Sequence, residues 1–332
     1  VVSHHILLEK LSHYGIRGLP LQWFTSYLTD RKQSVKVNGA TSSQRVITHG
    51  VPQGSVLGPI LFLLYINDLT VSMRTDNFKL FLFADDTTLL IRHRNLDDLL
   101  AMANSELSHM SKWFATNKLS LNIEKTKYIL FSHRKSPCNL PLVVSINDAP
   151  IQRTTHAKFL GVAIDESLTW DVHISNIAIK ISKSMGIIRK VAQKIPEKTR
   201  LQLYQALVVP YYSYCHLVWC TASQSRMNRL NLLQKRAVRC IALAPYLAHS
   251  QPILDSLKIL PFFKLQEYHS TVFLFKYLNH MLPTTFTSQF PLAPLIPSRQ
   301  TRIPYSKFQI PLFRTVLGQK SLSFRLIKVH NE

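Results

Sequence analysis

Two adjacent carboxylates, Asp85 and Asp86, stand between two apolar runs in the sequence FLFADDTTLL. Runs of this composition are typical of β-strands, so the acidic pair is expected at the turn between strands Lys79–Ala84 and Thr87–Arg92. A tight turn lets neighbouring side chains reach one side, although neighbours within a strand point to opposite faces. Such a pair offers the oxygen ligands that hard divalent cations prefer. Without further context, an ordinary solvated turn is the commoner explanation.

A second candidate lies about thirty residues upstream, where the sequence HGVPQGSVLGP leads into an apolar run. Its Gly and Pro content predicts a turn before a helix over Leu57–Asp68. Gly54 lets the backbone approach a ligand, Gln53 offers a donor and an acceptor, and a helix N-terminus near Ser55 favours an anion. Taken by itself, this loop could equally have a purely structural role.

Five segments of the sequence are informative through the order and spacing in which they follow one another. They are Val51–Leu69 (VPQGSVLGPILFLLYINDL), Phe83–Asp86 (FADD), Asn122-x-x-Lys125-Thr126, Phe159–Val162 (FLGV) and Leu233–Arg239 (LQKRAVR). Together they resemble the reverse transcriptases of LINE-type (non-LTR) retrotransposons, most closely the jockey-like group. The first four resemble successive motifs of the catalytic domain, and the fifth resembles an element of the thumb. The opening residues 1–18 resemble the end of the preceding motif.

The resemblance implies an α+β fold, a right-hand polymerase in which a palm is followed by an all-α thumb, with the fingers absent. The palm, an antiparallel sheet with helices, would span residues 1–170 and be truncated at its N-terminus. The thumb would span 171–283, and 284–332 would form a Pro-containing basic tail. The residue pattern agrees, because strands and helices mix until about residue 170 and apolar residues then recur at steps of three and four. The tail lacks periodicity and is expected to be extended or poorly packed.

The resemblance also implies RNA-directed DNA polymerase activity on a primed RNA template, with DNA primer, dNTPs and two Mg²⁺ ions. Asp85 would be a metal ligand with Asp86 in a supporting role, and Lys125 would protonate or stabilise the leaving pyrophosphate. Lys125 could otherwise be a surface lysine. The template and nucleotide side would be lined by Pro52, Gln53, Gly54, Phe83 and Ala84. The primer grip would comprise Phe159, Leu160 and Gly161, of which the first two could otherwise be core residues.

One part of the family pattern is not in this sequence. The aspartate of the first palm motif, which supplies the opposing metal ligand, would directly precede Val1. The chain is therefore expected to be a fragment that starts just after this motif and has no polymerase activity by itself. Fingers and an endonuclease domain would belong to the same polyprotein. The alternative is a non-catalytic, nucleic-acid-binding remnant of a truncated element.

The charge of the chain is large and unevenly distributed. The chain has 40 Lys and Arg but only 18 Asp and Glu side chains, which gives a formal charge of +22. Residues 174–332 hold 22 of the basic and only 4 of the acidic side chains. Such an excess indicates a polyanionic partner, in the first place nucleic acid and less favourably a membrane surface. A helix face whose only role is solubility normally carries both acidic and basic side chains. The expected backbone contacts are Lys180, Lys183, Lys190, Lys194, Arg229, Lys235, Arg236 and Arg239.

Composition excludes several other classes. Hydrophobic residues make up 46% and charged residues 17%, which excludes a disordered chain. The four cysteines are too few and scattered for a disulfide framework or a compact zinc site. With no signal peptide and no membrane-spanning run, we expect an intracellular protein, nuclear or cytoplasmic as a ribonucleoprotein, which is not secreted and has no membrane partner.

Overall fold

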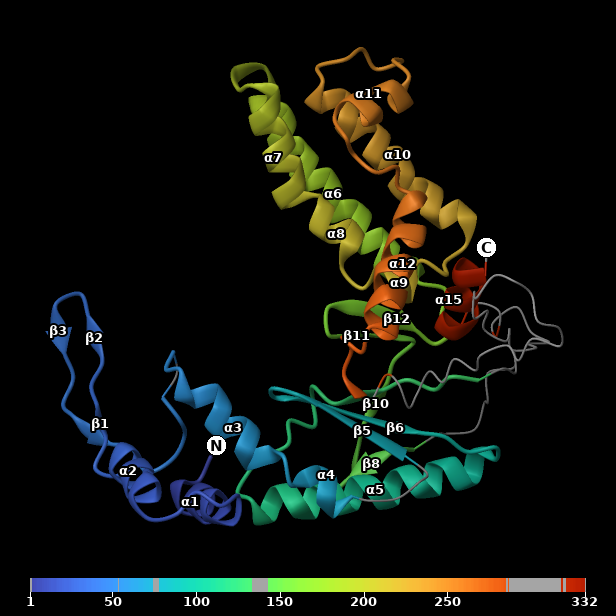
Figure 1. Cartoon of the computed structure of the whole chain (residues 1–332). Coiled ribbons are helices and arrows are strands. Elements are labelled where there is room, and N and C mark those ends of the chain that lie inside the picture. The colour runs from blue at the N-terminus through green and yellow to red at the C-terminus, as the bar shows by residue number, and fades with distance from the viewer. Residues whose placement is uncertain are drawn as a thin grey trace. The chain divides into compact units, whose positions relative to one another are not determined.

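The computed structural model describes residues 2–52, 54–73, 78–132, 143–284, 286, 318 and 321–331. The chain forms two compact units, Val1–Thr154 and Thr155–Glu332 (Figure 1). The amino-terminal unit mixes helices with short strands, and the described part of the carboxy-terminal unit is a set of helices with one β-hairpin. This mixture confirms the predicted α+β class.

Helices supply most of the packing in the amino-terminal unit. They are α1 (His4–His13), α2 (Leu19–Leu28), α3 (Leu57–Ile66), α4 (Leu69–Ser72) and α5 (Leu96–Thr116). Antiparallel pairs are β1 (Lys32–Gln33) with β4 (Arg45–Val46), β2 (Lys36–Val37) with β3 (Ala40–Thr41), β5 (Phe78–Phe83) with β6 (Asp86–Ile91), and β8 (Ser145–Ile146) with β9 (Ala149–Pro150). One parallel pair joins β7 (Lys127–Tyr128) to β10 (Gln152–Arg153). Within the described residues each sheet has two strands, so the palm-type antiparallel sheet is represented by hairpin pairs rather than by a continuous sheet.

A buried tyrosine connects three of these helices. Tyr65 on α3 is fully buried, and its hydroxyl donates to the carbonyl oxygen of Asn117 at 2.6 Å and accepts from the amide of Ser3 at 3.3 Å. Lys10 on α1 donates to the Tyr65 carbonyl at 2.7 Å and pairs with Asp68 at 2.8 Å. Burial raises the pKa of Tyr65, so its hydroxyl remains a donor. These contacts fix α3 between α1 and the end of α5.

The hairpin β5–β6 has one packed face and one open face. Alternate residues of β5, including Phe78 and Leu82, pack with Met110 and Phe114 of α5. The intervening residues, such as Phe83, point away from this core and are exposed. A two-stranded hairpin is marginal by itself, and packing of one face against a helix is what stabilises it. The open face is therefore available to a ligand.

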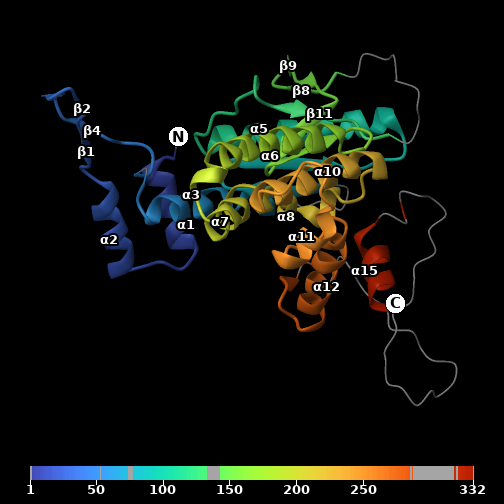
Figure 2. The ribbon, with the colours of Figure 1, turned by 90° about the horizontal axis from the view of Figure 1, so that it is seen from above.

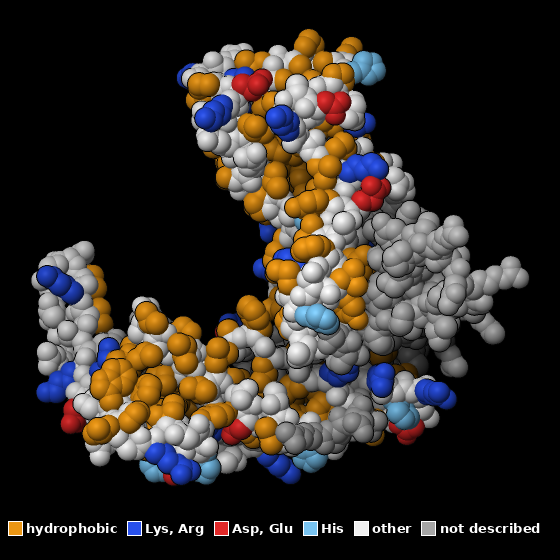
Figure 3. Space-filling model, in the orientation of Figure 1, with side chains coloured by type: hydrophobic (Ala, Val, Ile, Leu, Met, Phe, Trp, Pro, Cys, Tyr) orange, Lys and Arg blue, Asp and Glu red, His pale blue; other side chains and the backbone are white. Residues whose placement is uncertain are grey.

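Helix α3 is apolar on every side, with the sequence LGPILFLLYI. Leu61 and Tyr65 face the core, whereas Val56, Ile60 and Leu63 are exposed. Figure 3 shows apolar side chains gathered over the part of this unit that holds α2 and α3. A helix of this composition is normally covered on all sides, so the described residues cover only part of its surface.

The carboxy-terminal unit is built around two long helices. Its elements are β11 (His156–Phe159), β12 (Val162–Asp165), α6 (Asp171–Val191), η1 (Ala192–Lys194), α7 (Glu197–Leu207), α8 (Val209–Ser213), α9 (His216–Trp219), α10 (Gln224–Ile241), α11 (Ser250–Ser256), α12 (Lys264–Leu278) and α15 (Leu322–Asn331). Helices α6 and α10 lie along each other (Figures 1 and 2). Apolar residues seven positions apart, Ile174, Ile181 and Ile188 on α6, meet Leu230 and Ala237 of α10 in one core.

Two buried polar side chains complete this core. Gln234 of α10 accepts from the amide of Phe262 at 2.7 Å and donates to the carbonyl of Leu260 at 3.0 Å, which holds the segment before α12. Arg200 of α7 is buried, and its guanidinium donates to carbonyl oxygens at helix ends, those of Ala192, Ile195 and Ile241. The hydrogen bonds of these two buried side chains are satisfied only in this arrangement, so they specify how the helices pack together.

The position of hairpin β11–β12 corrects one local prediction. The apolar composition of Phe159–Ile164 predicts a single strand, but the segment turns at Leu160 and Gly161 and pairs Phe159 with Val162. Both turn residues take positive φ, which a continuous strand does not allow. The compact units divide between Thr154 and Thr155, so this hairpin packs with the helices. The boundary between palm and thumb at residue 170 stays a prediction, because it divides the chain by function rather than by packing.

Part of the tail is better packed than its composition predicts. Helix α15 lies against α12, where Leu326 and Ile327 are buried with Leu274. Its Arg325 donates to the carbonyl of Leu217 at 2.6 Å and contacts the Cys220 sulfur at 2.7 Å. The expectation of an extended tail is therefore wrong for 322–331, because apolar residues there form one helical stripe. Apart from 286, 318 and 321, residues 285–321 lie outside the described part.

Over the described ranges, no helix combines the length and apolar character that crossing a bilayer requires.

Two histidines meet at the junction of α9 and α12, where His216 is buried and His269 is half-buried. The ring of His216 lies 4.6 Å from that of Trp219 and 5.3 Å from that of His269, and its Nδ1 is 2.9 Å from the carbonyl oxygen of Tyr212. Burial, reinforced by the neighbouring His269 ring and by the positive charge of Arg325, lowers the pKa of His216 to about 4. Burial lowers the pKa of His269 as well. Both imidazoles are therefore neutral in the folded protein at pH 7.

Replacement of His216 by Leu should flatten the acid dependence of stability. The unfolded imidazole has its ordinary pKa near 6.5, so the neutral buried form contributes fully above that pH and loses its contribution as the pH falls toward 4. The loss amounts to about 3 kcal/mol at most. Urea unfolding at several pH values measures it. The exposed His249→Leu variant should keep the wild-type profile, and an unchanged profile for His216→Leu would contradict the assignment.

Candidate functional site

The two candidate metal ligands lie at the end of hairpin β5–β6. The turn consists of Ala84 and Asp85, one residue earlier than predicted, because Ala84 takes a left-handed φ of 49° and Asp86 already pairs with Phe83. Paired residues share one face, so Asp86 lies on the open face beside Phe83, whose side chain is 63% exposed. Both carboxylates are exposed to solvent.

The chemistry of this turn fits a divalent cation in part. Asp85 and Asp86 supply hard oxygen donors on neighbouring residues, the type that Mg²⁺ prefers. Among the described residues, no group of three or more His, Cys, Asp and Glu side chains lies close enough to hold a metal ion. The turn by itself therefore offers oxygen donors from two carboxylates, fewer than the six or more oxygen ligands that a hard divalent cation takes.

The loop before α3 is held by its own motif residues. The hydroxyl of Ser55 donates to the carbonyl of Pro52 at 2.8 Å and accepts from the amide of Gly58 at 3.0 Å. Gly54 has a φ of 77°, and a Cβ on Gly58 would lie 2.7 Å from the Pro52 carbonyl oxygen. Gln53, a predicted template or nucleotide contact, lies outside the described residues. Ser55 and Gly58 were not predicted as site residues, although the two shape this loop.

The predicted Lys125 is presented on an exposed turn. The side-chain oxygen of Asn122 accepts from the Lys125 amide at 3.0 Å, and the Thr126 hydroxyl donates to the Asn122 carbonyl at 2.8 Å. The other two residues of the motif thus build the turn and leave the lysine ammonium free to reach a ligand.

The predicted primer-grip residues form the turn of β11–β12. Phe159 ends β11 and is half-buried, while Leu160 and Gly161 occupy the two turn positions with φ values of 44° and 87°. Positive φ at both central positions is typical of the tight hairpin turn whose twist matches its strands. These residues belong to the carboxy-terminal unit, whereas the carboxylate turn, the Pro52 loop and Lys125 belong to the amino-terminal one.

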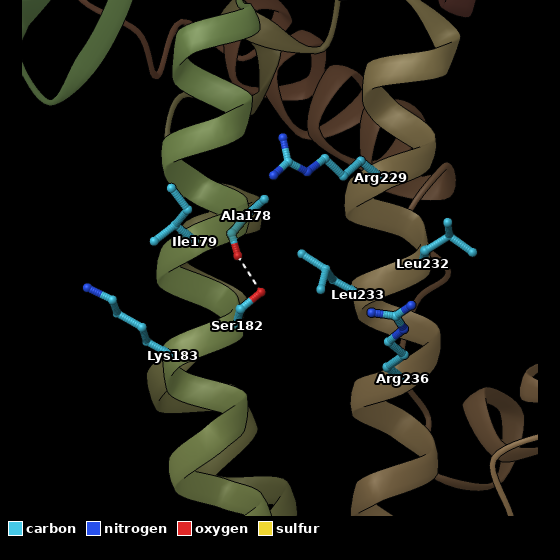
Figure 4. Close-up of a pocket in the computed structure, with 8 residues that line it drawn as sticks. All are labelled: Ala178, Ile179, Ser182, Lys183, Arg229, Leu232, Leu233 and Arg236. Carbon is cyan, nitrogen blue, oxygen red and sulfur yellow. Dashed lines mark hydrogen bonds between the residues drawn. The ribbon is translucent and has the colours of Figure 1, made fainter.

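A groove between α6 and α10 brings together three of the predicted cations. Lys183 of α6 lines it with Arg229 and Arg236 of α10, and its volume is about 550 Å³. Figure 4 shows Arg229 reaching from α10 into the space between the two helices, whereas Arg236 lies along α10. The remaining lining residues are neutral, namely Ala178, Ile179, Ser182, Leu232 and Leu233. The groove therefore has an apolar floor and a positively charged rim, which suits an anionic ligand.

The other predicted cations are placed differently. The guanidinium of Arg239 donates to the Ala248 carbonyl at 2.7 Å and fixes the loop after α10. The ammonium of Lys180 lies 5.7 Å from the centre of the Tyr211 ring. Lys190 and Lys194 are exposed, and Lys235 is half-buried. Their contacts with nucleic acid stay predictions.

Arg226, which lies on the arginine-rich helix α10, is paired with a carboxylate. Its guanidinium pairs with Asp171 at the start of α6 at 2.7 Å. Arg229 instead donates to the neutral hydroxyl of Ser175 at 3.0 Å. Only the tertiary contact of α6 with α10 distinguishes these two arginines.

Comparisons with known proteins agree with these motifs. Residues 1–164 match the family described as "Reverse transcriptase (RNA-dependent DNA polymerase)". The chain is 28% identical over 243 residues to "RNA-directed DNA polymerase from mobile element jockey" of Drosophila melanogaster, a match that covers 70% of this chain and 26% of that protein. Two further Drosophila melanogaster relatives are assigned to mobile elements by name. They are the "Probable RNA-directed DNA polymerase" from transposon X-element, 27% identical over 79% of this chain and 30% of the relative, and that from transposon BS, 30% identical over 74% of this chain and 28% of the relative.

The chain belongs to the LINE-type reverse transcriptases. The family match includes the carboxylate turn, the Lys125 turn and the hairpin turn Phe159–Gly161. Since the match to the X-element protein extends over 278 residues, the likeness continues into the helical unit. The chain spans less than a third of the length of each of these three relatives.

Two helical glycines of this chain should respond in opposite ways to alanine. Gly58→Ala places a Cβ against the Pro52 carbonyl, so the loop must shift and the free energy of unfolding should fall by about 1–3 kcal/mol. Gly186→Ala meets nothing within 4 Å on the exposed side of α6 and should gain up to about 1 kcal/mol from helix propensity. Thermal and urea unfolding measure both, and equal effects would contradict the close contact at Gly58.

Proposed function

We propose that this chain is the palm and thumb portion of an RNA-directed DNA polymerase that extends a DNA primer on an RNA template. The observation that carries the proposal is the exposed Ala84-Asp85 turn, which presents two adjacent carboxylates at the end of a hairpin within the matched family segment. Support comes from the conformations of the Pro52 loop and the Lys125 turn, whose motif residues hold them in exposed positions.

Asp85 and Asp86 are the residues that would hold Mg²⁺. Bound there, the metal ions would activate the primer 3′-hydroxyl and stabilise charge at the α-phosphate. Because both carboxylates are solvent-exposed on the turn, they can take up the ions together with the nucleotide phosphates. Mg²⁺ is the cation expected from the oxygen donor set.

The remaining site residues have separate tasks. The Lys125 ammonium, exposed on its turn, donates a proton or a hydrogen bond to the departing pyrophosphate. Gly54 keeps the loop surface free of a side chain, so that a template base or the incoming nucleotide can approach the backbone. The turn Phe159–Gly161 orients the primer end.

The basic helical unit binds the sugar–phosphate backbone. Lys183, Arg229 and Arg236 line one groove, and Arg229 and Arg236 are seven residues apart, about 10 Å along α10. A row of cations at this spacing can contact successive phosphates of a duplex, while the apolar floor excludes water from these contacts.

We further propose that synthesis requires a third carboxylate beyond the described residues, the one that the family pattern places immediately before Val1. The fingers and an endonuclease domain would be partners in the same polyprotein, and a nuclear or cytoplasmic ribonucleoprotein would be the setting. A non-catalytic remnant that only binds nucleic acid is the alternative, and the activity experiment below separates the two.

Primer extension on an RNA template with Mg²⁺ should be absent for this chain and present when its natural upstream residues are included. In the longer protein, Asp85→Asn should lower the rate by on the order of 10³-fold, since several kcal/mol of transition-state stabilisation are lost. The exposed Asp148→Asn variant is the matched control. An inactive longer protein that still binds primed RNA would favour the remnant, and activity of the present chain would contradict the need for a third carboxylate.

Removal of the groove cations should weaken binding to an RNA–DNA duplex and reduce its salt dependence. In Lys183→Gln/Arg229→Gln/Arg236→Gln, the slope of log K against log salt should fall in magnitude by about 2–3, close to 0.9 for each lost phosphate contact. Fluorescence anisotropy across a salt series measures the slope. The control Lys198→Gln/Lys258→Gln/Lys276→Gln removes equal charge from exposed positions outside the groove, and an equal effect there would show that only net charge matters.

A further inference from the structure

The turn of β11–β12 is bonded to a tyrosine far along the chain. The hydroxyl of Tyr214 donates to the carbonyl oxygen of Leu160 at 2.6 Å, across 54 residues of sequence. Leu160 is a bulky residue with a φ of 44°, a conformation that such residues rarely adopt. A conformation of this kind persists only where the surroundings determine it, and Tyr214 supplies such a contact.

The ring of Tyr214 also fits the second residue of the turn. A Cβ on Gly161 would lie 3.2 Å from Cε1 of this ring, closer than most side chains allow. The φ of Gly161 is 87°, so glycine is favoured both by the backbone and by the ring. Tyr214 therefore contacts each of the two residues that shape the turn.

Tyr214 is itself fixed by the core of the helical unit. The indole nitrogen of Trp219 donates to the Tyr214 carbonyl at 2.8 Å, and Trp219 is fully buried. The amide of Tyr214 donates to the carbonyl of Pro210 at 3.0 Å. A continuous chain of contacts thus runs from the buried indole to the exposed turn.

The body of the hairpin is held without Tyr214. Val162 is buried in the core of the helical unit, and the amide of Ala163 donates to His173 at 3.2 Å. The carboxylate of Asp165 accepts from the amide of Trp170 at 2.7 Å. Tyr214 is 53% exposed and its hydroxyl bonds to the tip of the hairpin, so this hydroxyl contributes to the orientation of the turn more than to the stability of the unit.

We propose that Tyr214 is a positioning residue that locks the turn Leu160-Gly161 in the conformation that contacts the primer end. The proposal rests on the proposed primer-binding function of Phe159–Gly161. Through Tyr214 the turn is tied to the start of α9, so the grip on the primer end is set by the helical unit that binds the duplex backbone.

The test compares Tyr214→Phe with wild type in the full chain. Tyr246→Phe, at a side chain that is 72% exposed, is the matched control. Binding is measured by anisotropy to two labelled RNA–DNA duplexes of equal length, one with a recessed DNA 3′-end and one blunt. Hydrogen exchange of the peptide 156–165 reports on the turn itself, and thermal unfolding confirms that each variant is folded.

Wild type should prefer the recessed end, and Tyr214→Phe should lose about fivefold of that preference, the equivalent of one hydrogen bond. Its affinity for the blunt duplex should not change, and exchange at the turn should accelerate by a similar factor. If Tyr214→Phe keeps the preference, or loses affinity for both duplexes equally, the positioning role is wrong and the proposed function stands. If wild type shows no preference, the primer-binding function of the turn fails, and the positioning role fails with it.

Discussion

The packing of α10 along α6 is the contact on which the carboxy-terminal unit depends. Isoleucines seven residues apart on α6 meet Leu230 and Ala237 of α10, so the two helices stay aligned over several turns. This alignment places cations from both helices on one groove. It also creates the core that receives Val162, through which hairpin β11–β12 is attached. The basic groove and the attachment of the hairpin through Val162 thus both follow from one apolar contact.

Motif residues of this chain serve structure as often as chemistry. In the Asn122-x-x-Lys125-Thr126 segment, two of the named positions close a turn and one faces solvent. In the element LQKRAVR, Gln234 binds backbone groups inside the core, and Arg239 holds a loop. A recurring sequence therefore does not by itself identify the residues that touch a ligand. The conformation that those residues impose on a loop is equally part of the site.

Sequence patterns predicted the long helices well and the turns less well. The sequence Leu96–Thr116 predicts a helix with the bounds that the structure shows, and in the structure the side chain of Asn95 caps its first turn. The acidic turn was displaced by one residue, since no pattern shows that Ala84 takes positive φ. The hairpin turn at Leu160-Gly161 was missed for the same reason, because its conformation is stabilised by Tyr214, a contact that local sequence does not contain.

By itself, the sequence determined the family, the α+β class, the carboxylate pair and the sign of the charge on the helical half. These follow from residue identity and short-range spacing, which the chain carries before it folds. The tertiary structure decided which cations share a groove, that Arg226 is paired with Asp171, and that 322–331 is a packed helix. It also decided what holds the turn at Leu160. Each of these depends on which distant residues become neighbours, and that is set by side-chain packing across the core rather than by the order of residues along the chain.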